Sequence, residues 1–340
     1  PDGYVTDQKP QEFTFEYQGS GTSVAEYAFT FEDEQTTVEL SKADLTDKKE
    51  LPGASLKVTD EDGNTVDEWV SKEEAHIIKG LIVGKKYKMT ETKPADGYVT
   101  AESIEFTVEN TKEVQKHQML DDVTKVEISK KDITDSSEVP GAKLIILDKD
   151  GKKVESWTST DKPHMVEKLP VGEYTLREEQ APDGYLIAED VKFTVKDTGK
   201  VQKVKMKDAH PYGKLVIKKT DSTSKAALSG AEFELREKES GKVVEKLVTD
   251  KTGTATSGKI PIATYKNGKV EKTVEYILVE TKAPNGYELS SKKEEIRFEY
   301  KDGKTKVIEI VKEIKNTKSP SGSTPTGNSP KTGDSTNIWL

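Results

Sequence analysis

Apolar and polar residues alternate along many short segments of this chain. In VEISKKD (126–132), Val126 and Ile128 fall on one face of the segment, and Glu127 and Lys131 fall on the other. Alternation with a period of two is typical of a half-buried β-strand. Between such segments lie dipeptides that favour hairpin turns, namely Asp62-Gly63, Asp150-Gly151, Asn267-Gly268 and Asp302-Gly303. No helical period of useful length occurs, so the pattern predicts an all-β protein.

The strand pattern occurs three times along the chain. VELSKAD (38–44) recurs as VEISKKD and again as LVIKKTD (215–221). The segment ADGYVTAESIEFTVEN (95–110) recurs as PDGYLIAEDVKFTVKD (182–197). Repeats within one chain indicate duplicated domains, and units of roughly 100 residues made of short strands are typical of β-sandwiches. We therefore expect tandem sandwich domains at 38–124, 125–211 and 212–318, the third with an extra hairpin at 264–273.

The two ends of the chain differ from the repeats. Residues 1–37 resemble only the second half of a unit, so we interpret them as the C-terminal half of a truncated domain. By register, Asp33 occupies the place that Asp121 has in the first complete repeat. We expect this segment to be protease-sensitive, and a separate polypeptide that carries the missing first half to complete it. Residues 319–340 are rich in Ser, Pro, Gly and Thr, as linkers are.

Composition excludes several classes of function. The net charge is -9, with 53 basic and 62 acidic residues interspersed, which argues against a nucleic-acid partner. There is no cysteine, so disulfides and Cys-ligated zinc are excluded. The four histidines lack zinc spacing. Segments 60–64 and 148–152 lack the glycine at position six and the glutamate at position twelve of a calcium loop. We expect neither a metal nor a cofactor, and no segment approaches the roughly 18 apolar residues of a membrane span.

On three strands of each repeat, a polar residue follows apolar residues in phase on the inward face. In the second repeat, Val126 and Ile128 are followed by Lys130, and the same pattern leads to Glu178 and to Asp208. The three sets are Lys42, Glu91 and Asp121; Lys130, Glu178 and Asp208; and Lys219, Glu280 and Asn316, with Asp122 as an alternative to Asp121. A buried ammonium is costly unless it is paired or neutral, so each lysine needs a partner.

Two interpretations of these inward polar residues are possible. One is a structural ion pair, or strand ends that have already reached water. The other is chemical: desolvation lowers the pKa of a lysine toward a neutral amine nucleophile and raises that of a glutamate toward a proton-carrying acid. Attack of the amine on the Asp or Asn side-chain carbonyl would form an amide and expel water or ammonia. Because all three repeats carry the same set, we favour the chemical interpretation.

The same residues carry a resemblance to a known family. YILVETKAPNGY (276–287) resembles the E-box of Gram-positive pilins and adhesins, and YTLREEQAPDGY (174–185) and YKMTETKPADGY (87–98) are looser copies. Together with SGAEF (229–233) and IKNTK (314–318), they resemble CnaB-type, or SpaA-like prealbumin-fold, domains. The resemblance implies self-generated isopeptide bonds that join Lys42 to Asp121, Lys130 to Asp208 and Lys219 to Asn316. It implies Glu91, Glu178 and Glu280 as the catalytic residues, and Asp33 as an acceptor without its lysine.

The tail carries a second motif. Ser329, Pro330, Lys331, Thr332 and Gly333 resemble a sortase sorting signal of LPxTG type, with serine in place of leucine. The resemblance implies that sortase joins Thr332 to an amine of peptidoglycan or of a pilin. It also implies a hydrophobic membrane span, of which NIWL (337–340) would be the first residues and the rest is missing from this fragment, and a location on the Gram-positive cell wall. Plain linker sequence is the alternative.

These expectations converge on a wall-anchored surface stalk, from an adhesin or an accessory pilin, made of cross-linked β-sandwiches. Each bond would form once, so the chain is not expected to be an enzyme. One alternative is a ligand-binding adhesin module that contacts an unidentified host protein or glycan through the hairpin at 264–273. Another is a set of accessory β domains from a secreted enzyme.

Overall fold

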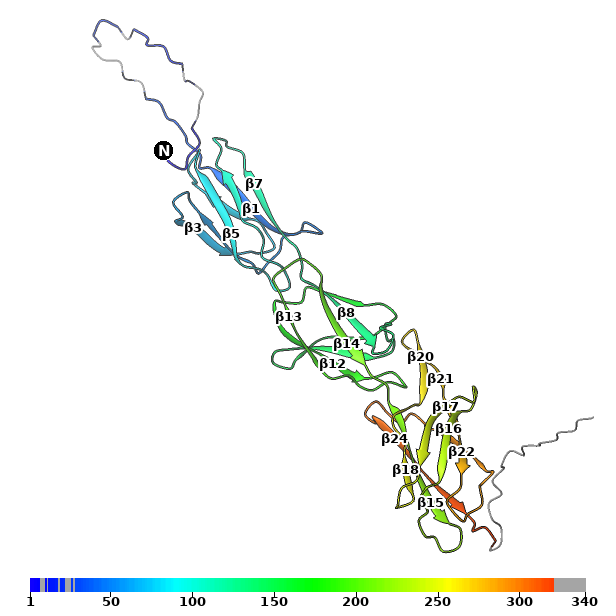
Figure 1. Ribbon diagram of the computed structural model, residues 1–340. Helices are drawn as coiled ribbons and strands as arrows, with labels where there is room; N and C mark the ends of the chain where they lie inside the picture. Colours follow the sequence, from blue (N-terminus) through cyan, green and yellow to red (C-terminus); the bar gives the residue numbers. More distant parts are fainter. Residues whose placement is uncertain (7–9, 11, 18, 22–25, 27, 321–340) are drawn as a thin grey trace, which may run out of the picture. The chain divides into compact units, whose positions relative to one another are not determined.

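The computed structural model describes residues 1–6, 10, 12–17, 19–21, 26 and 28–320 (Figure 1). Among these residues, all the regular secondary structure consists of β-strands. No described segment forms a helix long and apolar enough to cross a membrane. The prediction of an all-β chain of tandem sandwich domains is confirmed. Each repeat consists of two facing sheets.

In the first repeat, a three-stranded sheet in the order β4-β1-β7 faces a four-stranded sheet in the order β3-β2-β5-β6. The first and last strands, β1 and β7, are parallel neighbours (Figure 1). The other pairs of neighbouring strands are antiparallel. The strands are β1 Thr37–Asp44, β2 Ser55–Thr59, β3 Thr65–Val70, β4 His76–Lys79, β5 Lys86–Lys93, β6 Ile104–Thr107 and β7 Gln115–Asp121.

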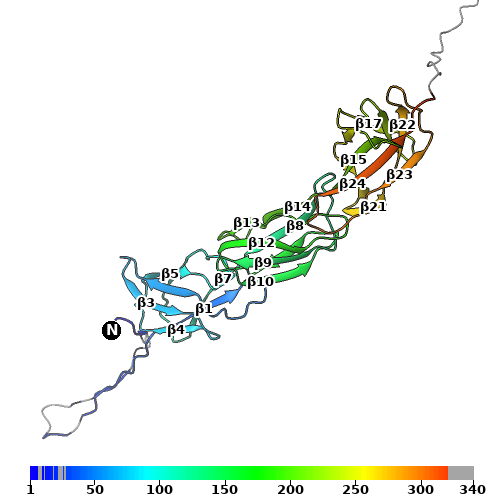
Figure 2. The same ribbon diagram turned by 90° about the horizontal axis from the view of Figure 1, so that it is seen from below.

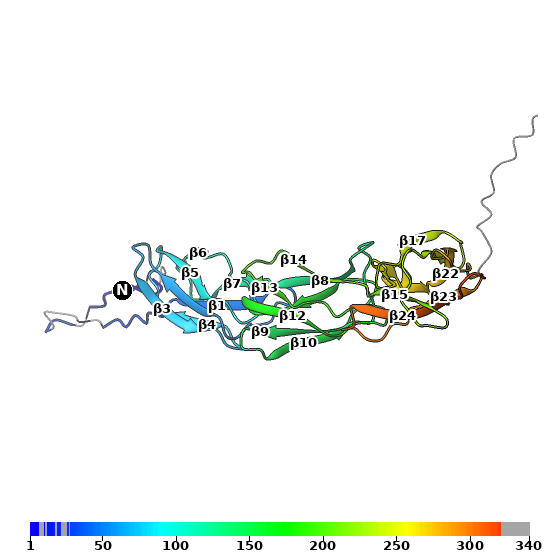
Figure 3. The ribbon, with the colours of Figure 1, turned by 60° about the horizontal axis from the view of Figure 1, so that its bottom comes forward.

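The second repeat has the same topology, with sheets in the orders β11-β8-β14 and β10-β9-β12-β13. Figure 3 shows β9, β10 and β12 of the larger sheet. The strands are β8 Lys125–Asp132, β9 Lys143–Asp148, β10 Lys153–Thr158, β11 His164–Glu167, β12 Gly172–Gln180, β13 Val191–Val195 and β14 Gln202–Asp208.

The third repeat keeps the plan with an added hairpin. Strand β15 pairs with β18, β19 and β24 in one sheet, and Figure 2 shows β15 beside β24. The other sheet has the order β17-β16-β22-β23, and β20 pairs with β21. The strands are β15 Tyr212–Asp221, β16 Glu232–Glu237, β17 Val243–Val248, β18 Thr254–Thr256, β19 Ile260–Pro261, β20 Ala263–Lys266, β21 Lys269–Thr273, β22 Glu275–Lys282, β23 Lys293–Arg297 and β24 Val307–Asn316.

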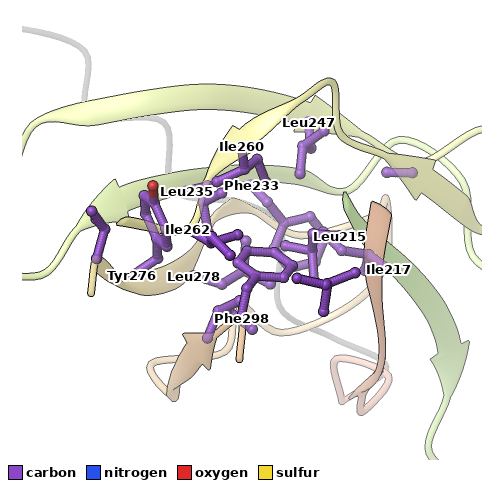
Figure 4. Packing of buried hydrophobic residues seen from close by; sticks show 14 of the residues in the cluster. Leu215, Ile217, Phe233, Leu235, Leu247, Ile260, Ile262, Tyr276, Leu278 and Phe298 are labelled. Carbon is purple, nitrogen blue, oxygen red and sulfur yellow. The ribbon is translucent and has the colours of Figure 1, made fainter. Parts of the chain in front are cut away.

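Alternating apolar residues from the two facing sheets form the core of each repeat. In the third repeat, Leu215 and Ile217 from β15 pack toward Phe233 from β16 and Leu278 from β22 (Figure 4). All four side chains are almost fully buried. Burying one such side chain contributes about 1.5–3 kcal/mol. Ile217 and Leu278 lie two residues before the inward polar residues of β15 and β22, so the polar residues lie at one end of this core.

Three of the four predicted hairpin turns are confirmed. The chain reverses between β2 and β3, between β9 and β10, and between β20 and β21. Asn267 and Gly268 both have positive φ, as the tightest two-residue turn requires. The hairpin prediction at Asp302-Gly303 is wrong, because β23 and β24 on either side belong to different sheets. There, the Asp302 side chain accepts hydrogen bonds from the backbone of Lys304 and Thr305 and shapes a loop between the sheets.

The two ends of residues 1–37 pair with each other just before β1. Val5 donates its backbone N–H to Glu34, and Thr36 donates its N–H to Gly3. The described residues between them form no strand and leave Phe15 and Phe31 more than half exposed.

Candidate cross-linking site

The lysine and its expected acceptor lie on neighbouring parallel strands in the first and third repeats. In the third repeat, Lys219 on β15 is opposite Ile314 on β24, and Asp221 is opposite Asn316. The first repeat has the same register, with Asp44 opposite Asp121. Residues i and i+2 of a strand share a face, so Lys219 and Asn316 both point into the core. The glutamate comes from the facing sheet, where Glu280 on β22 is opposite Phe233.

In the third repeat, the three polar side chains meet in the core. Lys219 is fully buried, and Glu280 and Asn316 are 4% and 2% exposed. Lys219 Nζ lies 3.1 Å from Glu280 Oε1 and also contacts Asn316 Oδ1. Asn316 Nδ2 donates to both carboxylate oxygens of Glu280, at 3.0 and 3.1 Å. The amine therefore lies against the amide carbonyl that it would attack, and the carboxyl group contacts both partners.

Burial makes the Lys219 amine easier to deprotonate. Desolvation lowers the pKa of Lys219, although the nearby Glu280 carboxylate opposes the shift. The ring of Phe233 lies 5.7 Å from Nζ and forms part of this apolar surrounding. A proton transfer from Lys219 to Glu280 would leave two neutral groups in a place where charges are costly.

The first repeat has the same arrangement with an aspartate as the acceptor. Lys42 Nζ lies 3.0 Å from Glu91 Oε1 and contacts Asp121 Oδ1. Lys42 and Asp121 are each 1% exposed, and Glu91 is 4% exposed. Burial raises the pKa of Asp121 to about 7 against the lowering effect of Lys42, and the Glu91 carboxyl raises it further. The alternative acceptor, Asp122, instead binds Lys125 Nζ through both of its oxygens, at 2.8 and 3.0 Å.

In the second repeat, Lys130 Nζ lies 3.0 Å from Glu178 Oε2, and both side chains are buried. Asp208 is fully buried at the end of β14, the neighbour of β8, which carries Lys130. The sets differ in their acceptor, aspartate in the first two repeats and asparagine in the third.

Backbone groups that hold the glutamates were missed in the sequence. The N–H of Ala101 donates to Glu91 Oε2 at 2.7 Å, and the N–H of Ser290 donates to Glu280 Oε2 at 2.8 Å. Both donors lie ten residues after their glutamate, a repeated spacing that could have indicated them. In the third repeat, a cavity of about 300 Å³ is lined by Glu280, Ser290 and Lys292 among others.

Two further predicted sites, Asp33 and the sorting motif, lie outside the three buried sets. Asp33 is exposed, and its place in the chain comes just before β1. The sorting motif, Ser329 to Gly333, lies outside the described residues. No group of three or more potential metal-ligating side chains occurs among the residues that the structure describes.

The repeats match a known family along most of the chain. The model of the SpaA prealbumin-like fold domain matches residues 36–122, 124–210 and 213–314. The chain belongs to this family. Its SpaA-type repeats thus account for all three sandwiches. No curated protein sequence matches the chain significantly.

Solved structures with similar folds include the Bacillus anthracis TIE protein, at 27% identity and a TM-score of 0.55, over 83% of this chain and 51% of that one. The chain thus spans about half the length of that protein. BcpA, the major pilin subunit of Bacillus cereus, matches at 19% identity and a TM-score of 0.49, over 84% of this chain and 99% of BcpA. The major pilin SpaD of Corynebacterium diphtheriae matches at 18% identity and a TM-score of 0.39, over 84% and 98% of the two chains.

Proposed function

We propose that each SpaA-type repeat forms one covalent bond between its first and last strands, and that the cross-linked array serves as an extracellular stalk on a Gram-positive surface. The observation that carries this proposal is the buried contact of Lys219 with Glu280 and with the Asn316 carbonyl, on parallel strands at the end of a core. The first repeat holds its own set in the same arrangement.

In the third repeat, the reaction begins with proton transfer from Lys219 Nζ to Glu280. The neutral amine then attacks Cγ of Asn316, and a new C–N bond forms. Glu280 relays one proton from the attacking nitrogen to Asn316 Nδ2, which it contacts at 3.0 Å. The bond between Cγ and Nδ2 breaks, and ammonia leaves. The product amide is neutral, so the cost of burying a separated charge pair disappears.

In the first repeat, the acceptor must lose a hydroxyl group, so it must carry a proton. The raised pKa of Asp121 favours that protonated form near neutral pH. Lys42 first gives a proton to Glu91, the neutral amine then attacks Cγ of Asp121, and Glu91 relays a proton from the attacking nitrogen to the hydroxyl oxygen of Asp121. The bond between Cγ and that oxygen breaks, and water leaves. We assign the same roles to Lys130, Glu178 and Asp208 in the second repeat.

The placement of the bond suits a stalk under tension. Force that enters at Thr37 passes along β1 to Lys42, crosses the bond to Asp121 and leaves from the end of β7. The intervening residues carry no load. By analogy with disulfides, closing a loop of 79 residues would stabilise the repeat by roughly 4–5 kcal/mol. Sortase-mediated attachment through Thr332 would anchor the array, with Ser329, Pro330, Lys331 and Gly333 completing the signal.

The alternative role of the extra hairpin, as a contact surface for a host ligand, gains no support from its packing. Tyr265 on β20 donates its hydroxyl to the Gly184 carbonyl at 2.8 Å, and its ring stacks on His210 at 3.4 Å. The main aromatic side chain of the hairpin is therefore occupied within the chain.

Intact-mass spectrometry of the purified chain tests the proposal directly. The mass should fall below the sequence value by two waters and one ammonia. Peptide mapping should recover three branched peptides, joining Lys42 to Asp121, Lys130 to Asp208 and Lys219 to Asn316. A natively purified chain with the full sequence mass would refute cross-linking.

A further inference from the structure

The three chain segments that carry the reacting groups are tied together just beyond the site. In the third repeat, the N–H of Ser222 donates to the backbone carbonyl of Asn316 at 2.9 Å, which links the end of the lysine strand to the acceptor. The N–H of Glu288 donates to the carbonyl of Thr317 at 3.0 Å, which links the segment after the glutamate strand to the acceptor strand. The Tyr287 hydroxyl donates to Asp221 Oδ2 at 2.9 Å and closes the triangle.

The same triangle of hydrogen bonds occurs in the other two repeats. In the first, Leu45 donates to the Asp121 carbonyl at 2.8 Å and Val99 donates to the Asp122 carbonyl at 2.9 Å. Its side-chain bond runs from Tyr98 to Asp44 Oδ2 at 2.8 Å. The second repeat has the bonds Ile133 to Asp208 at 3.0 Å, Leu186 to Ala209 at 2.9 Å and Tyr185 to Asp132 at 2.7 Å.

The aspartate in each triangle is held in one orientation. Asp221 Oδ1 accepts the backbone N–H groups of Thr223 and Ser224, which leaves Oδ2 for Tyr287. These hydrogen bonds lower the pKa of Asp221 to about 2, so the acceptor is ionised. A hydrogen bond to a charged acceptor is stronger than one between neutral groups.

We propose that Asp221 and Tyr287, with their counterparts Asp44–Tyr98 and Asp132–Tyr185, are positioning pairs for cross-linking. This inference rests on the proposed cross-linking function. Two sides of each triangle are backbone hydrogen bonds, so the Asp–Tyr bond is the side that depends on side chains. It fixes the end of the lysine strand against the segment that follows the glutamate strand.

The positions of Asp221 and Tyr287 along the chain explain why the hydrogen bond between them affects the reaction. Asp221 lies two residues after Lys219, and Tyr287 lies seven residues after Glu280. A shift between the two strands would separate Nζ from the carboxyl group and from the acceptor. Misplacement of reacting groups by about 1 Å can cost roughly a hundredfold in rate.

The third repeat gives the clearest test, because the other two aspartates have an additional partner. Lys168 Nζ lies 3.4 Å from Asp44 Oδ2, and His210 Nε2 lies 2.8 Å from Asp132 Oδ2.

The full chain is synthesised in a cell-free reaction, and samples are quenched in denaturant at intervals. Mass spectrometry then follows the loss of ammonia from the fragment that carries residues 219 and 316. Tyr287→Phe should slow that loss by about tenfold or more.

Tyr276→Phe is the matched control. Tyr276 lies on the same strand as Glu280 and donates its hydroxyl to the Pro261 carbonyl at 2.6 Å, away from the triangle. Both substitutions remove one hydroxyl hydrogen bond, and their effects on stability are compared by thermal unfolding in an unlinked Glu280→Ala background. A positioning role predicts slow linking for Tyr287→Phe alone, even where both variants lose similar stability.

A second pair of variants decides the matter if Tyr287→Phe does not fold. Asp221→Asn can keep its one oxygen for the N–H groups of Thr223 and Ser224 and donate its amide N–H to the Tyr287 oxygen, so it should link within a few-fold of the original rate, whereas Asp221→Leu should link slowly. Linking of Tyr287→Phe at the original rate, equal slowing by Tyr276→Phe, or equal rates for the two Asp221 variants would overturn the positioning role. Absence of ammonia loss from the unaltered chain would instead refute the cross-linking function itself.

Discussion

Lys219 Nζ lies 3.1 Å from Glu280 Oε1, and neither side chain exposes more than 1% of its surface. The two residues come from facing sheets and meet across the core. A buried ion pair alone is a poor source of stability, because desolvation of two charges can exceed their attraction. Under the proposed cross-linking, Lys219 is the nucleophile and Glu280 the group that takes its proton, which leaves both neutral, and Asn316 contacts each of them.

Replacement of the glutamate should stop the reaction in its own repeat only. In Glu280→Ala, Lys219 and Asn316 should remain unlinked, because no group is left to take the lysine proton and relay it. We expect a fall in rate of about 10²–10⁴-fold, and a repeat that unfolds at a lower temperature. Fragment masses measure the result for each repeat separately.

Glu280→Gln is the matched control for this change, because the amide keeps the shape of the side chain and one oxygen that accepts hydrogen bonds but cannot relay a proton. It should be as slow as the alanine variant. Normal ammonia loss in either variant would show that Glu280 is not the catalytic residue.

Single-molecule pulling should show that the residues enclosed by each bond do not extend. The enclosed segments span 79 residues in the first repeat and 97 in the third. Lys42→Ala and Lys219→Ala should release about 270 Å and 330 Å of additional chain, respectively, at about 3.4 Å per residue. The unaltered chain should show neither extension step, and steps of these lengths in that chain would argue against the bonds.

The unlinked first repeat should lose stability as the pH rises. Burial raises the pKa of Asp121 from 3.8 to about 7, so the folded state binds a proton more tightly than the unfolded state does. The stability due to that proton is complete below about pH 4 and is lost as the pH rises through 7. In Lys42→Met, which cannot link and lacks the cation that opposes the shift, the unfolding temperature should fall between pH 5 and pH 8.

The double variant Lys42→Met, Asp121→Asn is the control for this pH dependence, since an amide does not titrate. Its unfolding temperature should change much less over the same interval. An equal slope in both variants would assign the titration to another group.

The sequence carried most of the information needed to predict this fold and its site. Strand period and self-similarity predicted three sandwiches, and the in-phase rule identified Lys219, Glu280 and Asn316, which the structure brings into contact. The fold prediction succeeded because a strand has only two faces, so the parity of a residue fixes its side, and the same parity places these three polar side chains on the inward face.

The features that the sequence did not reveal depend on contacts between distant segments. The Ser290 N–H that holds Glu280 carries no side-chain signal, and the bond from Tyr287 to Asp221 joins residues 66 positions apart. At Asp302-Gly303 the sequence predicted a hairpin that does not form, because a turn dipeptide does not determine whether its flanking strands share a sheet. Local patterns fix turns and faces, whereas sheet membership depends on the packing of the whole domain.

Sortase recognition of the tail should depend on one threonine. With purified sortase and a glycine peptide as the amine, the chain should lose the residues after Thr332 and gain the peptide. Thr332→Ala should abolish the exchange, whereas Thr326→Ala, which alters the other Thr-Gly dipeptide of the tail, should leave it unchanged. Equal effects of both substitutions, or no exchange at all, would identify the tail as linker only.

Limited proteolysis should cut the chain first between residues 12 and 33. Tyr17 is 83% exposed and Phe31 is 63% exposed, whereas Tyr87 and Phe106 in the first repeat are 6% and 5% exposed. Proteases need an extended, accessible backbone, so chymotrypsin should cleave after the exposed aromatic residues and spare the cross-linked sandwiches. Mass analysis at early times should show a resistant fragment that begins soon after Phe31 and retains all three branched peptides. Replacing the exposed Phe13, Phe15, Tyr17, Phe29 and Phe31 by serine should delay the first cut, and early cleavage within residues 37–318 of the unaltered chain would contradict the expected order.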